Sequence, residues 1–214
     1  VAPQGQQPSF WSSSFNQLQW VSGVLSYGLT YGEDGAVAGL YDGVNEWTYF
    51  YDDENRLKEV RRGQNVVYSC VYDAFGRPGK ETLNGVTRYL VWEGDQLQYE
   101  VGTNGAVARR YVWGVTGLLG YYDGTSLTRI ALKDGLGHVR ALMTPGRTVT
   151  DRYVYDAYGN DVVPGLHDTT EGNALRFRWN GSYGYRTLYL LAGRQTTNTA
   201  AVMHVGSRHY SPSL

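Results

Sequence analysis

The feature that most constrains this chain is a repeat of about 20 residues. Short segments that in most copies pair an aromatic residue with an acidic residue or a glycine begin at residues 31, 51, 72, 92, 113, 133 and 155, so successive copies are 20, 21, 20, 21, 20 and 22 residues apart. A near-constant spacing over seven copies is typical of repeat architectures, in which each copy forms one supersecondary unit.

A second series of turn signals lies between these copies. Pairs ending in glycine occur at 42–43, 62–63, 84–85, 104–105, 123–124 and 145–146, several of them Asn-Gly or Asp-Gly, the favoured two-residue hairpin turns. Each unit therefore contains two turns and two strands. With 19 Tyr, 6 Trp and 28 Gly, the composition also favours β-sheet with tight turns. The sequence predicts an all-β fold, a long antiparallel meander of hairpins with about 20–21 residues per unit that curls into a β-spiral or shell-like sheet.

The residues of the repeat have a structural interpretation. The aromatic residue closes a strand, the aspartate accepts hydrogen bonds from backbone N–H groups of the following turn, and the glycine supplies a positive φ. We expect these structural roles, rather than catalysis, for Tyr31, Tyr51, Asp52, Tyr72, Asp73, Gly76, Arg77, Trp92, Trp113, Asp134, Gly137, Tyr155, Asp156 and Gly159.

Three segments are expected along the chain. Residues 1–26 are predicted as an N-terminal arm, residues 27–160 as the repeat sheet, and residues 161–214 as a C-terminal β segment. Because the first residue is Val, we interpret the chain as processed or cut from something longer, and a signal peptide already removed would fit.

The repeat resembles the RHS/YD-repeat family. The likeness rests on Tyr-Asp-x-x-Gly-Arg at 72–77, on its relative at 155–160, and on the segment Asp-Gly-Leu-Gly-His-Val-Arg-Ala-Leu at 134–142. It covers roughly residues 27–212, strongly in the middle and more loosely before Tyr31 and after Asn160. Members of that family are typically secreted or surface-delivered polymorphic toxins, in which the repeat sheet forms a shell around a C-terminal toxin domain and an aspartic-protease-like core region releases the toxin by self-cleavage. The resemblance implies that residues 161–214 correspond to the start of that core region, truncated before the cleavage motif.

The resemblance and the residues together predict a non-enzymatic structural scaffold of a secreted, extracellular or cell-surface protein, a shell piece of the type that encloses toxin cargo. Two alternatives stay open. One is a processed subunit that assembles head to tail into an extracellular filament or tube through unpaired strand edges. The other is a cell-surface adhesion or glycan-binding module, because exposed Trp and Tyr rings stack on sugars. The expected partner is the chain itself or the remainder of a longer RHS polypeptide.

Charge and motifs limit the chemistry that we expect. The formal net charge of −1 argues against a nucleic-acid partner, and no apolar run is long enough for a transmembrane segment. No catalytic, metal-binding or cofactor-binding residue is nominated, and no cofactor is expected. Read as one regular strand, the five-residue interval between His204 and His209 puts them on opposite faces, which argues against a shared metal. The single cysteine, Cys70, is expected to be a small buried hydrophobic residue.

Overall fold

The computed structural model of the chain describes residues 9–14, 17–22, 27–160, 175–190, 201–205 and 208–210. Most of these residues lie in β-strands, and the one helical element among them is a short 3-10 turn, η1 (Gly181–Tyr183). Within these ranges no helix has the length and apolar character needed to cross a membrane.

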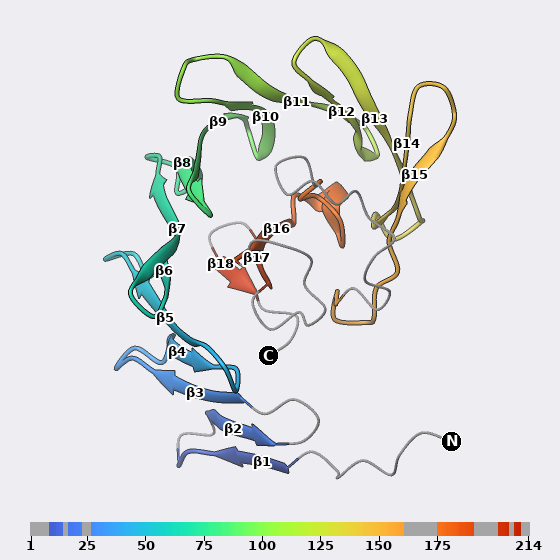
Figure 1. The fold of residues 1–214 in the computed structure, drawn as a ribbon. Coiled ribbons are helices and arrows are strands. Elements are labelled where there is room, and N and C mark those ends of the chain that lie inside the picture. Colours follow the sequence, from blue (N-terminus) through green and yellow to red (C-terminus); the bar gives the residue numbers. More distant parts are fainter. Residues whose placement is uncertain are drawn as a thin grey trace, which may run out of the picture. The chain divides into compact units, whose positions relative to one another are not determined.

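Fifteen strands form one sheet in which each strand pairs with the next one along the chain (Figure 1). The strands are β1 (Ser9–Ser12), β2 (Leu18–Ser22), β3 (Tyr27–Tyr31), β4 (Val37–Tyr41), β5 (Glu46–Tyr51), β6 (Leu57–Arg62), β7 (Asn65–Tyr72), β8 (Pro78–Leu83), β9 (Val86–Glu93), β10 (Gln96–Val101), β11 (Val107–Gly114), β12 (Gly117–Asp123), β13 (Ser126–Lys133), β14 (Val139–Met143) and β15 (Val149–Arg152). The prediction of an all-β antiparallel meander is confirmed.

The contacts divide the chain into two compact units, Val1–Ser69 and Cys70–Leu214. In the first unit the buried side chains include Leu40 and Trp47, which face each other across β4 and β5. The range 1–26, which the sequence predicts as an arm, contains β1 and β2; β1 pairs with β2, and β2 pairs with β3. The boundaries of the three expected segments stay a prediction.

The second unit adds a small sheet made of β16 (Arg186–Tyr189), β17 (Ala201–Val205) and β18 (Arg208–Tyr210), paired in that order. Strands β8–β15 curve around the segment that leads into this sheet (Figure 1). One core joins them, because Leu175 and Phe177 are buried in the same cluster as side chains of β9–β14. The ring of Phe177 meets the rings of Tyr111 and Trp113 edge-on, at centroid distances of 5.0 and 5.2 Å. Burial of such aromatic rings accounts for much of the stabilisation of a small β core.

Close packing between β12 and β13 depends on a residue without a side chain. A Cβ atom built on Gly120 would overlap the carbonyl oxygen of Arg129 on the facing strand. We expect Gly120→Ala to lower the free energy of unfolding by about 1–3 kcal/mol, because backbone atoms cannot move aside as a flexible side chain does. Urea denaturation measures the change.

The control for this prediction is Gly135→Ala. No heavy atom lies within 4 Å of a Cβ built there, and two other copies of the repeat carry alanine at the equivalent position, Ala74 and Ala157. A change within about 0.5 kcal/mol is expected for the control. Equal stability of the two variants would contradict the close-packing argument.

Candidate functional site

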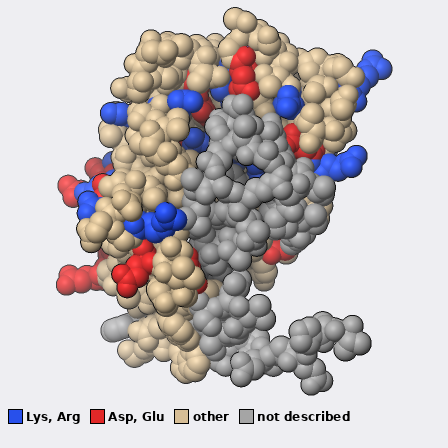
Figure 2. All heavy atoms as spheres, in the orientation of Figure 1, with Lys and Arg blue, Asp and Glu red and all other residues tan. Residues whose placement is uncertain are grey.

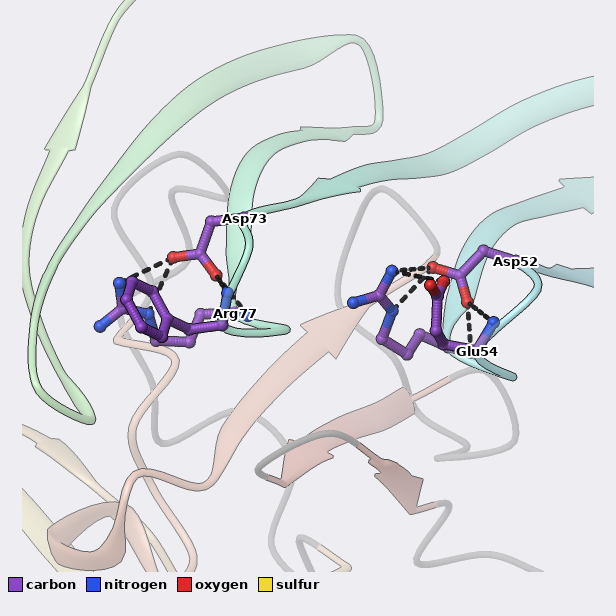
Figure 3. A network of polar contacts seen from close by, with 6 residues as sticks. Asp52, Glu54, Asp73 and Arg77 are labelled. Carbon is purple, nitrogen blue, oxygen red and sulfur yellow. Dashed lines mark hydrogen bonds and ion pairs between the residues drawn. The ribbon is translucent and has the colours of Figure 1, made fainter.

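The aspartate of the repeat organises each turn through both of its carboxylate oxygens. In the turn after β7, Asp73 Oδ1 accepts hydrogen bonds from the backbone N–H groups of Phe75 and Arg77, each at 2.9 Å, and Oδ2 accepts from Arg77 Nε at 2.8 Å (Figure 3). The carbonyl oxygen of Asp73 also accepts the N–H of Gly76 at 3.0 Å. The backbone groups that the reversal leaves without strand partners are thus paired locally.

The same arrangement occurs in the first unit. Asp52 Oδ1 accepts the N–H of Glu54 at 3.2 Å and that of Arg56 at 2.8 Å, while Oδ2 accepts from Arg56 Nε at 2.7 Å (Figure 3). The carboxylate of Glu54 takes a further bond from the Arg56 guanidinium at 2.9 Å. At the position that holds glycine in other copies, Asn55 adopts a φ of 59°, a conformation that asparagine tolerates better than most residues.

Two later turns keep the pattern with different partners. Asp134 accepts two backbone N–H groups at 3.0 Å and the Nε of Arg140 at 2.7 Å. Asp156 accepts two backbone N–H groups, at 2.8 and 2.9 Å, and the side-chain amide of Asn160 at 2.8 Å. Gly137 and Gly159 close these turns with φ of 82° and 95°.

These hydrogen bonds set the charge state of the turn aspartates. Partial burial opposes the effect, yet the bonds from Arg77 and Phe75 lower the pKa of Asp73 below its usual value of 3.8. The pKa values of Asp52, Asp134 and Asp156 are lowered for the same reason. At neutral pH each of these carboxylates is therefore ionised and already accepts hydrogen bonds from its own turn. Such a group is not suited to act as a general acid or base.

The aromatic residue of the repeat donates a hydrogen bond to the strand before it. Four of these bonds reach a carbonyl at or next to the first residue of the preceding strand, at 2.6–2.9 Å: Tyr31 to Leu18, Tyr51 to Val37, Trp92 to Pro78 and Trp113 to Leu97. Tyr155, which follows β15, donates to Val139 at the start of β14 at 2.9 Å. Tyrosine O–H and tryptophan N–H serve equally as donors. The structure thus places the predicted repeat residues at successive strand ends and turns along the chain. It does not gather them into one site.

A buried charge cluster, which sequence reasoning missed, lies in the second unit. Glu81 on β8 is 1% exposed, and its two oxygens accept hydrogen bonds from the two terminal nitrogens of Arg186 on β16, each at 2.8 Å. Arg176 donates to the same carboxylate at 2.7 Å. The partners are 95 and 105 residues from Glu81 along the chain, so no local pattern could have paired them. The sequence signal that could have indicated this cluster is Glu81 itself, a charged residue within a stretch expected to form a strand.

The cluster continues along the neighbouring strands. The hydroxyl of Tyr111 donates to Glu100 Oε1 at 2.6 Å, and Arg109 is paired with Asp123 at 2.8 Å. Burial alone would raise the pKa of Glu81, but the guanidinium groups of Arg186 and Arg176 outweigh it and lower that pKa to about 2. Burial and the neighbouring Glu100 raise the pKa of Tyr111. Glu81 is therefore ionised at neutral pH, and its bonds to Arg186 link β16 to β8.

The sequence interpretation of His204 and His209 was wrong. The two residues do not share one strand: they lie on β17 and β18 and are direct cross-strand partners. Their ring centroids are 5.1 Å apart at an angle of 66°. Because β17 and β18 are antiparallel and the two residues are directly opposite, both rings project from the same face of the sheet. Even so, no group of three or more His, Cys, Asp or Glu side chains with metal-site geometry occurs in the described part of the chain.

Cys70 and His138 have packing roles. Cys70 is buried, as expected. His138 stacks on Trp179, with ring centroids 5.7 Å apart and nearly parallel, and its Nδ1 accepts the N–H of Asn180 at 2.9 Å. On the face drawn in Figure 2, the described Lys and Arg side chains are interspersed with Asp and Glu. That face therefore shows no extended basic surface among the residues that are described.

Three relatives found by comparison with curated proteins are all WapA proteins. No protein-family profile matches the chain. The tRNA3(Ser)-specific nuclease WapA of Bacillus spizizenii is 26% identical over 206 residues, which is 94% of this chain and 8% of that protein. The tRNA nuclease WapA of Bacillus subtilis strain 168 and the tRNA(Glu)-specific nuclease WapA of Bacillus subtilis subsp. natto are 25% and 26% identical over the same proportions. The chain thus spans 8% of the length of these relatives.

Among solved structures, the TcdB2-TccC3 crystal structure matches 95% of this chain and 18% of its own at a TM-score of 0.37 and 10% identity. The Photorhabdus luminescens Tc holotoxin pore matches the same share at a TM-score of 0.29 and 10% identity, covering 17% of that chain. Both scores lie below 0.5, so they do not establish a shared arrangement of the chain.

The relatives correct the functional prediction. All three are named tRNA nucleases, an enzymatic function, which contradicts both the purely non-enzymatic scaffold and the expectation that the protein is not an enzyme. The filament and adhesion alternatives receive no support from them. The prediction failed because it was drawn from repeat residues whose turn roles say nothing about the rest of a polypeptide.

We expect Asp73→Ala to destabilise the protein by about 1–2 kcal/mol, because several hydrogen bonds are lost at one turn. Asp73→Asn keeps an acceptor oxygen and loses mainly the ion pair with Arg77, which is exposed enough that about 1 kcal/mol or less is expected. Since the pKa of Asp73 is lower in the folded protein than its usual 3.8, its contribution is present above that pH and fades as the pH falls below it. Urea denaturation at neutral and acid pH tests this.

The matched control is Asp53→Ala. Asp53 is exposed in the turn after β5 and stands at the position that holds Ala74 in the next copy. Its replacement should change stability by less than about 0.5 kcal/mol. If Asp53→Ala were as costly as Asp73→Ala, the carboxylate bonds would not explain the turn.

For the buried cluster we expect Glu81→Gln to cost about 3–5 kcal/mol, because the substitution leaves Arg186 and Arg176 buried without their shared anion. The control is Glu59→Gln, which breaks the partly exposed pair with Arg61 and should cost less than about 1 kcal/mol. Thermal unfolding of both variants measures the difference. A Glu81→Gln protein as stable as Glu59→Gln would show that the cluster does not hold the strands.

Proposed function

We propose that this chain is a segment of a tRNA nuclease of the RHS toxin type. The observation that carries the proposal is the similarity to three WapA proteins named as tRNA nucleases, which extends over 94% of the chain. The Tyr-Asp repeat supports the RHS assignment, since four of its aspartates make the same turn contacts in this structure. The proposed substrate is tRNA.

In this proposal the buried cluster holds the C-terminal strands in place and does not contact RNA. Hydrolysis or transfer at a phosphodiester requires acid and base groups that reach the phosphate. Glu81 and Arg186 are buried, and the carboxylate of Glu81 already accepts hydrogen bonds from two guanidinium groups. We therefore assign to Glu81, Arg176 and Arg186 the task of fixing the C-terminal strands inside the curve of β8–β15.

The proposal includes the context in which the segment works. Because the chain spans 8% of its relatives, its proposed partner is the remainder of a longer polypeptide rather than a second copy. Export from the cell follows from the proposed toxin type. The domain division at residues 26 and 160, with a core-like segment beyond, belongs to the same proposal.

The test is digestion of total tRNA by the purified protein that carries this segment and, in parallel, by the 214-residue chain, followed by denaturing electrophoresis and sequencing of the cleaved ends. We expect cleavage of tRNA at discrete positions by the protein that carries the segment, and loss of that activity on Glu81→Gln through displacement of the C-terminal strands. Glu59→Gln should cleave at the unaltered rate.

Intact tRNA after incubation with the folded longer protein would overturn the proposal. Cleavage by the longer protein and not by residues 1–214 would place the nuclease centre outside this segment. Cleavage by the 214 residues alone would place it inside.

A further inference from the structure

Three side chains form a row across the small C-terminal sheet. Arg186 on β16 is the cross-strand partner of His204 on β17, and His204 is the partner of His209 on β18. Directly opposite residues of antiparallel strands project from the same face. The row therefore presents one guanidinium and two imidazoles on a single face of the sheet.

This face lies against β8. Arg186 donates to both oxygens of Glu81, so the row begins at a buried carboxylate of the large sheet. His204 is 4% exposed, and the Nε2 atoms of both histidines are buried. The imidazoles therefore sit in the contact between the small sheet and the meander, not at its outer surface.

The charged groups described around this contact are already paired with one another. Three guanidinium groups meet three carboxylates in the cluster: Arg109, Arg176 and Arg186 with Glu81, Glu100 and Asp123. Both oxygens of Glu81 already accept guanidinium hydrogen bonds. A proton on His204 or His209 would add a positive charge beside the guanidinium of Arg186, and repulsion between like charges is strong where water is excluded.

The surroundings keep both imidazoles neutral at pH 7. Burial, followed by the charge of Arg186, lowers the pKa of His204 well below 6.5, against the opposing effect of Glu81. The same two causes lower the pKa of His209 to about 4. Glu81, with a pKa of about 2, stays ionised throughout mild acidification.

We propose that the row Arg186–His204–His209 is an acid-sensitive release for the C-terminal sheet: protonation of the two imidazoles separates β16–β18 from Glu81 on β8 and leaves the meander in place. The inference goes beyond the proposed function and does not depend on nuclease activity. Its elements are a neutral pair of histidines, a shared carboxylate and a small sheet attached at this contact.

The direction of the effect follows from the histidines. Their pKa is lower in the attached state than the 6.5 of a free imidazole, so the released state binds more protons. The attached state is therefore fully stable above about pH 6.5 and loses stability as the pH falls from there towards about 4. The carboxylates do not titrate within this window in the attached state, since the pKa values of Glu81 and Glu100 are lowered.

Hydrogen–deuterium exchange at about pH 7 and about pH 5, corrected for intrinsic exchange rates, tests the proposal on the full chain. Amides of β16 and β17 should lose protection by about tenfold or more on acidification, while those of β9 and β10, which carry no histidine, serve as the internal reference and should change much less. Equal protection of β16 and β17 at both pH values would overturn the proposal.

The double substitution His204→Phe and His209→Phe keeps ring size and removes both titrating groups. Protection of β16 and β17 in this variant should be the same at both pH values. Loss of protection on acidification equal to that of the unaltered protein would also overturn the proposal. Should the variant fail to fold, titration of the histidine ring protons by NMR in the unaltered protein decides, because a midpoint near 6.5 for both residues is incompatible with the proposed device.

Discussion

The fold depends on how the chain pairs its backbone N–H groups at each reversal. In a meander of fifteen strands the chain reverses between neighbouring strands, and a reversal takes backbone donors away from their strand partners. In the repeat turns, one aspartate carboxylate accepts two of these donors and one side-chain donor, as Asp73 does with Phe75 and Arg77. These aspartates therefore mark where strands of the repeat end.

Much of the fold could be predicted because its determinants are local. The bonds of Asp73 reach four residues ahead, and a two-residue turn such as Asn84-Gly85 needs only its own positive φ values. The attachment of the C-terminal strands could not be predicted, because Glu81 and Arg186 are 105 residues apart and nothing in either neighbourhood marks the other. His204 and His209 were misread for a related reason: a chain reversal lies within the five-residue interval, and a strand periodicity applied across a turn assigns the wrong face.

The second unit combines two kinds of stabilisation that respond differently to conditions. The aromatic contacts of Phe177 with Tyr111 and Trp113 depend on burial and are insensitive to pH. The contact of Arg186 with Glu81 depends on charge balance in a dry environment. The two kinds of contact therefore hold the C-terminal segment of this unit under different conditions.

The hydrogen bond from the repeat aromatic to the preceding strand has a consequence for how such sequences diverge. Tyr51 and Trp92 occupy equivalent places and reach equivalent carbonyls, although one offers an O–H and the other an N–H. The bond requires a donor at this place, and either residue supplies one. Two copies of the repeat can therefore differ in their aromatic residue and still form the same hydrogen bond. A count of identical residues then understates how similar their structures are.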